Sequence, residues 1–516
     1  MKRIIFSITI FLNILFSLVL GSCGRAKVPT GNVEEGVGEL HIVPDYTSIV
    51  IPPNIAPLNF EVDMDGEEYV VRVTGADGKS LVAVGDVIRW DIKDWHKLLD
   101  TSKGKDIKYE VFVKKDGKWS LYEFTNHVAD EPIDSHLSYR LIEPSFVQYS
   151  GMSINMRDLT SFDEEIVYST PHPCDERRGQ CVNCHVPRNQ YKDRSSQFHV
   201  RRTKGGTVVM SGDSVRKINL KTDSTISAGV YPAWHPALDL IAYSTNDTKQ
   251  KFFSKGEHKV EVYDSSSDLI LYDMKTHDVT NIASDSLLLE TFPGWAPDGK
   301  KIYYSVARYP DGVGPDDVPH NYERMHYDIV SRNFDLATRR FSEPDTVVYA
   351  SVDSLSALLP RISPDGKYLL YCQAPFGTFH IWHKDSDLYM MDLATGETRP
   401  LRNANSEDTD SYHSWSSNSR WIVFSSRRDD GSYTRPYIAY ISEDGRDSKA
   451  FVVPQESPEY YRELMKSYNV PEFFNDSFEV KRKDIVRELD KDPIQAGFRG
   501  AHAGVAERQG AQRETN

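Results

Sequence analysis

Two cysteines and a histidine have the spacing of a cofactor-binding motif: Cys181, Cys184 and the adjacent His185. The chain has five cysteines and 16 histidines in 516 residues, so a Cys-x-x-Cys-His run arises by chance with a probability on the order of 10⁻³. Two thiols three positions apart, on one turn of backbone, can add across the two vinyl groups of a haem and direct the next histidine at the iron. The spacing predicts one covalent haem c, with His185 as the proximal ligand.

Two other interpretations of these residues stay open. Cys174, Cys181, Cys184 and His185 are four possible zinc ligands within 12 residues. Cys181 and Cys184 could instead form a short redox disulfide, although nothing around Val182 indicates the helix start that such a motif needs. Haem is the favoured interpretation, because the full motif rarely arises by chance and the chain has an export signal.

Side chains elsewhere are candidate partners of that haem. Three histidines are expected at the ends of inner strands, where each could supply a sixth iron ligand or a substrate contact, the alternative being a structural role: His199, His235 and His413. Three arginines could pair with haem propionates, because guanidinium and carboxylate groups match as a bidentate fork, the alternative being a salt-bridge cluster in a loop: Arg427, Arg428 and Arg435.

The N-terminus has the pattern of an export signal. Basic residues at positions 2 and 3 precede an apolar run from Ile4 to Leu20, and Gly21 and Ser22 then lead to Cys23. This pattern predicts a signal peptide over residues 1–22, lipidation of Cys23 and a tether over 23–37. Because no acidic run follows Cys23, we expect an outer-membrane lipoprotein of the cell envelope that faces the periplasm.

The composition excludes some classes of function. A net charge of -15 argues against nucleic acid as a partner, because phosphate binding needs a basic face. The chain lacks the Gly-x-Ser-x-Gly elbow of a hydrolase and the His-Glu-x-x-His pattern of a metallopeptidase. Whether the protein is an enzyme is left open by the sequence.

Repeated sequence segments predict the strands that must position the haem motif. Each phrase predicts a strand, a tight turn and a second apolar strand, and four copies can be read: residues 231–236, 292–299, 359–366 and 412–419. A downstream marker, an apolar strand that closes on a polar turn residue, recurs six times at spacings of 61, 54, 62, 57 and 50 residues: Asp158, Asn219, Asp273, Asp335, Asp392 and Ser442. Such periods predict an all-β fold with six propeller blades over residues 138–455, and an insertion over 171–197 that carries the haem motif.

The flanking segments are predicted from their patterns. Residues 38–137 alternate as strands do and predict a small antiparallel β-sandwich, with a single helix over 93–99. Residues 456–496 are expected to form two short helices, around 460–468 and 482–490. The stretch 497–516 is expected to be a disordered tail, because it has little to bury.

The repeated phrases resemble the TolB-type propeller repeat, an aromatic residue followed by Ser-Pro-Asp-Gly, an apolar strand and an Asp turn. The resemblance covers about 315 residues and implies the fold, not a function. A propeller with one c-type haem is also similar in architecture to the middle domain of the hydrazine synthase alpha subunit, whose chemistry is not carried over because only one haem motif is present.

Two functions follow as hypotheses. The leading one is an electron-transfer or redox-enzyme accessory lipoprotein, whose haem exchanges electrons with a protein partner docked on the propeller. The alternative is a non-redox TolB-like interaction module of the envelope, in which Cys181, Cys184 and His185 bind zinc.

Overall fold

The structure is a computed structural model of the whole chain, and it describes residues 27–143, 151–170, 180–255 and 258–501. The predicted signal peptide, the lipidated Cys23, Cys174 and residues 502–516 lie outside the described residues. Within the described part, no helix is long and apolar enough to cross a bilayer.

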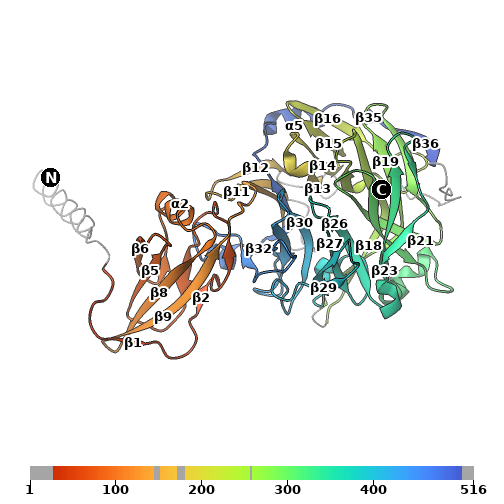
Figure 1. Cartoon of the computed structure of the whole chain (residues 1–516). Helices are drawn as coiled ribbons and strands as arrows, with labels where there is room; N and C mark the ends of the chain where they lie inside the picture. Colours follow the sequence, from red (N-terminus) through yellow and green to blue (C-terminus); the bar gives the residue numbers. More distant parts are fainter. Residues whose placement is uncertain (1–26, 144–150, 171–179, 256–257, 502–516) are drawn as a thin grey trace, which may run out of the picture.

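The N-terminal domain consists of two small sheets and one helix (Figure 1). A six-stranded sheet has the order β1-β9-β8-β5-β6, with β3 beside β9, and a three-stranded sheet has the order β2-β4-β7. Asp91 caps the helix by accepting hydrogen bonds from the Lys93 and Asp94 amides, as an N-cap aspartate does. The elements are β1 Val33–Glu35, β2 Ile42–Val43, β3 Val50–Ile51, β4 Phe60–Val62, β5 Glu68–Thr74, β6 Ser80–Val84, β7 Val87–Ile88, α2 Ile92–Asp100, β8 Lys105–Lys115 and β9 Lys118–Val128.

The remaining strands that the structure describes form six blades, so the prediction of an all-β propeller is confirmed. The innermost strand of each blade contacts the innermost strand of the next, which closes a ring. From the innermost strand outward, the first three blades are β34 Ser467–Phe474, β10 His136–Ile142, β11 Ser153–Asp158, β12 Glu164–Ser169; β13 Gln180–Pro187, β14 Ser195–Arg202, β15 Gly206–Ser211, β16 Ser214–Asn219; and β17 Val230–Trp234, β18 Leu240–Phe252, β19 Val260–Asp273, β20 Asp278–Ala283.

The other three blades follow the same order along the chain. They are β21 Leu288–Trp295, β22 Lys301–Arg308, β23 Tyr327–Asp335, β24 Arg340–Phe341, β25 Asp345–Val348; β26 Ser356–Ile362, β27 Tyr368–Ala374, β28 Asp387–Asp392, β29 Thr398–Pro400; and β30 Asp410–Trp415, β31 Trp421–Ser426, β32 Arg435–Tyr440, β33 Phe451–Val452. Short helices lie in the connections: α3 Val318–Asn321, α4 Tyr460–Glu463, α5 Arg482–Leu489 and 3₁₀ turns at Asn189–Tyr191, Pro315–Asp317, Tyr322–Arg324, Ala350–Asp353 and His380–Trp382.

The recurring aspartate of the sequence marker has a local structural role. The Oδ1 atom of Asp273 accepts the Lys275 amide at 2.8 Å, and that of Asp392 accepts the Ala394 amide at 2.8 Å. Each side chain therefore stabilises the turn between the third and fourth strands of its blade. The marker is explained by turn geometry.

The prediction for the C-terminal segment is wrong in part. Residues 467–474 form β34, the innermost strand of the first blade, where two short helices were expected over 456–496. Only α5 and the four-residue α4 are helical there. Since β34 pairs with β10, the two ends of the propeller sequence share one blade, and this pairing closes the ring.

Residues beyond α5 also pair with blades. Strand β35 Ile494–Gln495 adds in parallel to the outer edge of β16, and β36 Gly497–Ala501 adds to β20. The predicted disordered tail is therefore wrong for 497–501, because these backbone groups complete an otherwise open sheet edge.

The haem motif does not lie on an insertion. Residues 180–187 are the innermost strand of the second blade, and residues 195–202 are its second strand. The expected insertion over 171–197 is thus wrong over these residues, which belong to the blade framework itself.

The sandwich packs against the sixth blade (Figure 1). The rings of Tyr46 and Phe451 meet edge to face at 6.3 Å, and the Trp421 indole donates to the Glu131 carbonyl at 3.1 Å. One hydrophobic core runs from the sandwich into the propeller, so we expect the two parts to unfold together.

Candidate functional site

The Cys-x-x-Cys-His motif lies on β13, with a break in the strand pairing at its centre. The ladder between β13 and β14 shifts register between Asn183 and Val186, and Cys184 has a φ of 56°. The motif is thus an extended strand with a left-handed bulge, where the sequence predicted one turn of backbone.

The same bulge recurs in every innermost strand. Each blade has one non-glycine residue with positive φ at this point: Val470, Cys184, Tyr231, Phe292, Leu359 and Tyr412. The next residue is proline in four blades and histidine in two, namely His185 and His413. His185 therefore occupies the position in the second blade that His413 occupies in the sixth.

The imidazole ring of His185 is buried, and its nitrogens make no hydrogen bonds. The exposed fraction of His185 is 1%. Burial lowers the pKa of His185 to about 4, partly opposed by backbone groups of Ser138 and Val470, which lie beside the ring without reaching hydrogen-bond geometry. The imidazole is therefore neutral at neutral pH, which is the form that ligates a metal.

Both motif thiols are free. Cys181 is buried and Cys184 is partly exposed, and burial raises the pKa of the Cys184 thiol, opposed by the backbone of Tyr231 in the third blade. Arg140 donates to the Val182 carbonyl at 3.2 Å and so fixes the strand between the two cysteines.

Two free thiols and a buried imidazole without partners are the donor set that a haem c uses, so the chemistry of these residues fits that group. The contacts of the donors differ, because Cys184 lies by Tyr231 of the third blade and His185 by Ser138 of the first. Bringing them to one haem requires the backbone to rotate at the bulge, where ladder pairing is already interrupted.

The structure does not bring the three predicted partner histidines to His185. His199 lies on the second strand β14, not on an inner strand, and its Nδ1 atom is 3.2 Å from the Thr207 hydroxyl. His199 pairs with Asn183 and shares a sheet face with Gln197, which bonds Tyr243 of the third blade, so it faces away from the first blade.

The other two histidines are held by backbone groups. His235 donates from Nε2 to the Gly299 carbonyl at 3.1 Å and accepts the Leu238 amide at Nδ1 at 2.9 Å. His413 donates from Nε2 to the carbonyls of Leu359 at 2.8 Å and Leu370 at 3.1 Å. These bonds favour the structural role that the sequence left as the alternative.

The three predicted arginines lie in the sixth blade. Arg428 pairs with Asp410 at 2.8 Å and donates to the Ala404 carbonyl at 2.6 Å. Arg427 stacks on Trp382 at 4.6 Å, and burial lowers its pKa to about 10. Arg435 is 1% exposed and donates to carbonyls of the segment before β34. In the ring of blades, the first blade lies between the sixth blade and the second blade, which carries the motif.

We expect Arg435→Met to lower the free energy of unfolding by about 3 kcal/mol, because three carbonyl oxygens, of Tyr461, Leu464 and Lys466, lose a charged donor. Urea unfolding followed by fluorescence measures this. The control is Arg446→Met, whose exposed pair with Asp444 should contribute less than about 0.5 kcal/mol. An unchanged urea midpoint in Arg435→Met, together with an altered haem spectrum, would instead support the propionate role.

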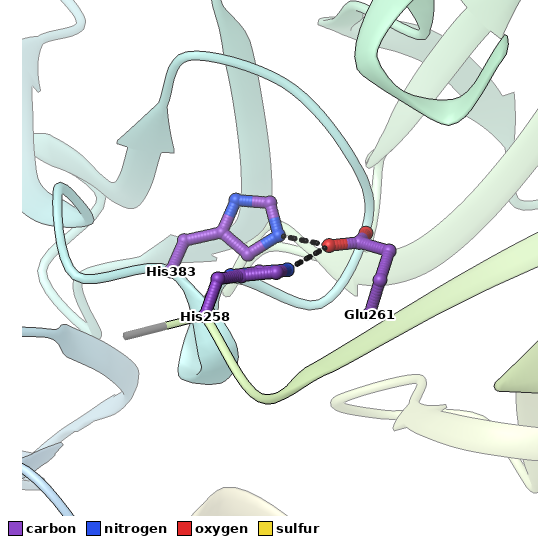
Figure 2. Close-up of side chains that lie close together, drawn as sticks. All are labelled: His258, Glu261 and His383. Atoms are coloured by element: carbon purple, nitrogen blue, oxygen red, sulfur yellow. Dashed lines mark hydrogen bonds and ion pairs between the residues drawn. The ribbon is translucent and has the colours of Figure 1, made fainter. Parts of the chain in front are cut away.

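A second group of ligand side chains was not found from the sequence. His258, Glu261 and His383 converge as Figure 2 shows, with the Nε2 atoms of His258 and His383 at 2.9 and 3.0 Å from Glu261 Oε2. Glu261 is fully buried, yet the two imidazoles hold its pKa below the usual value against the opposing effect of burial. Among the described residues this is the one cluster of three or more potential metal ligands whose donor atoms lie within 4.8 Å.

Local signals for this cluster were weak. His258 and Glu261 flank the start of β19, three positions apart, while His383 follows 122 residues after Glu261 in another blade. Cys181, Cys184 and His185 do not form such a cluster in the described part of the chain, and Cys174 lies outside it.

The strand order defines an all-β protein, a six-bladed β-propeller behind an N-terminal β-sandwich. No protein-family model and no curated protein matches the chain. Among solved structures it is similar to TolB from Acinetobacter baumannii, at 13% identity over 74% of this chain and 85% of that chain, with a TM-score of 0.40. It is also similar to a quinonprotein alcohol dehydrogenase-like protein from Bacteroides thetaiotaomicron, at 10% identity over 85% and 99% of the two chains, with a TM-score of 0.32.

Proposed function

We propose that this chain is a lipid-anchored envelope protein whose propeller holds one covalent haem c and exchanges electrons with a protein partner. The observation that carries the proposal is His185, a buried imidazole without hydrogen-bond partners that directly follows two free cysteines at haem-attachment spacing. A buried, unsatisfied polar ring is costly, and a bound metal would satisfy it.

The motif residues would have different roles in binding the haem. Cys181 and Cys184 would form the thioether bonds, and His185 would ligate the iron. The haem supplies a one-electron redox centre when bound. Arg140 fixes the motif strand to the first blade, since it donates both to Val182 and to the Asn469 side chain at 2.6 Å.

The surroundings of Cys184 support a redox role more than a hydrolytic one. The bulge residues Tyr231 and Tyr412 of two other blades lie half-buried near this thiol, and burial raises the pKa of both phenols above the usual range. These phenols therefore stay neutral and offer no strong base, whereas an aromatic lining suits a flat macrocycle.

The mature protein is expected to exceed the mass of residues 23–516 by its lipid and one haem when made in cells competent for haem attachment. Intact-mass measurement and the reduced pyridine haemochrome spectrum test this. Cys181→Ser with Cys184→Ser should abolish the covalent haem completely, because no thioether can form. Cys372→Ser is the matched control, because Cys372 is a buried free thiol in the fifth blade.

A mass that shows lipid alone, with one equivalent of zinc that disappears in the double cysteine variant, would overturn the haem proposal. That result would select the non-redox interaction module, with zinc at Cys181, Cys184 and His185.

A further inference from the structure

We propose that His258, Glu261 and His383 form a binding site for a divalent transition cation of the zinc type, separate from the haem motif. The three donors come from the tip of the β18–β19 hairpin in the third blade and from the loop between β27 and β28 in the fifth (Figure 2). Nothing in the proposed haem function requires this site.

The spacing of the donor atoms suits a shared ion. Nitrogen and oxygen ligands lie about 2.0–2.2 Å from zinc, so two ligands of one ion are separated by about 3–3.4 Å. The two imidazole nitrogens lie 2.9 and 3.0 Å from Glu261 Oε2, so small rotations of the side chains suffice to admit the cation.

The donor types and their burial define the kind of site. Two imidazoles and one carboxylate are a ligand set of zinc centres that keep an open coordination position. The side chains of Glu261 and His383 are 0% and 4% exposed, whereas that of His258 is 34% exposed. The Glu261 and His383 side chains are therefore enclosed by protein, and solvent can reach the cluster past His258.

Unsatisfied polar atoms around the cluster point to a missing ligand. Glu261 Oε1 is buried and has no hydrogen-bond partner, although Oε2 receives both imidazoles. The ring of His380 lies 5.5 Å from that of His383, and its Nε2 atom is also buried without a partner. A carboxylate that only accepted two hydrogen bonds would leave Oε1 desolvated and unpaired, whereas a cation beside it would offset that cost.

Aromatic side chains and one glycine shape the site. Phe253 packs on His258 at 5.5 Å and Phe376 on His383 at 4.8 Å, which limits water around the donors. Gly377 has a φ of +81°, and a Cβ there would lie 2.9 Å from His383 Cε1 and 3.1 Å from Glu261 Oε1. A glycine is needed for the loop to pass this close to two of the donors.

The site is linked to the central channel. Phe379 lies four residues before His383 and packs on the bulge residues Tyr231 and Phe292, at 6.1 and 5.9 Å. A bound cation would therefore hold the loop that places Phe379 among the innermost strands, and it would tie the third blade to the fifth.

Zinc binding to the full, tag-free chain, first depleted of metal with a chelator, tests the proposal. We expect one equivalent of zinc in the variant Cys181→Ser with Cys184→Ser, where the haem motif cannot contribute thiolates. Calorimetry should show the affinity of this double variant falling more than about 100-fold when His258→Ala is added, because one of three ligands is lost. Cobalt in place of zinc should give a visible spectrum without thiolate-to-metal charge transfer.

Controls separate binding from folding. His127→Ala removes an exposed His–Asp pair with a 2.8 Å contact in the sandwich and should leave zinc binding unchanged. Glu261→Gln keeps the shape of the side chain and should weaken binding while the far-UV spectrum is retained. The proposal is overturned if the double cysteine variant binds no zinc, or if it binds zinc equally well with and without His258→Ala. Failure of haem attachment would leave this result unaffected, so the two proposals fail independently.

Discussion

A chain that stops after Leu464 is expected to lose cooperative unfolding, because the ring of blades can no longer close. This truncation removes β34, whose backbone pairs with β10 and whose side chains Tyr468, Phe473 and Phe474 are at most 1% exposed. Burial of three such rings contributes roughly 4.5–9 kcal/mol, which is comparable to the net stability of a whole domain. Glu472, which pairs with Arg361 of the fifth blade at 2.8 Å, is lost as well.

Thermal unfolding followed by near-UV circular dichroism measures this effect. A chain that stops after Asp492 is the matched control, because it retains β34 and loses only the outer edge strands β35 and β36. We expect the control to unfold cooperatively at a slightly lower temperature. A sharp transition at the wild-type temperature in the shorter chain would show that β34 does not close the ring.

The closing strand also shows how far the sequence predicts the fold. The six blades followed from repeated turn markers, since Asp273, Asp335 and Asp392 each fix a local turn that a short phrase specifies. Strand β34 has no partner strand after it in the chain, so the hairpin phrase that marks other blades is missing. Its remaining signal is Val470 followed by Pro471, which matches the bulge of the other innermost strands.

The candidate sites differ in the same way. The spacing of Cys181, Cys184 and His185 is local and can be read directly, but the bulge that turns Cys184 and His185 toward different blades depends on packing between blades. His258 and His383 meet only because a long hairpin and a distant loop lie side by side. Such non-local contacts leave no periodic trace in the sequence.

Acidification from pH 7 to pH 5 is expected to lower the free energy of unfolding by several kcal/mol through buried histidines. Burial lowers the pKa of His199 and His413 to about 3 and that of His235 to about 4. Unfolded chains protonate these rings near pH 6.5, so below that pH the unfolded state binds more protons and stability falls. At pH 5 each ring contributes a loss of about 2 kcal/mol.

Several carboxyl groups whose pKa is raised by burial oppose this loss, and Asp264 and Asp387 have the largest part in it near pH 6. Burial raises the pKa of Asp264 and Asp387 to about 6, so the folded state takes up protons at these groups before the unfolded state does. Protonation of these carboxyl groups stabilises the fold as the pH falls through 6. This effect begins at a lower pH than that of the three histidines, and the pKa difference between the folded and the unfolded chain is smaller for each carboxyl group than for each histidine. The net expectation is therefore destabilisation between pH 6.5 and pH 4.

Urea midpoints of wild type and His413→Gln at pH 7 and pH 5 test the origin of this dependence. The glutamine amide can still donate to the Leu359 carbonyl but does not titrate, so the stability difference between the two pH values should shrink by about 2 kcal/mol. An equal pH dependence in wild type and His413→Gln would mean that His413 titrates in the folded state as it does in the unfolded chain, and would contradict its tight enclosure between the fifth and sixth blades.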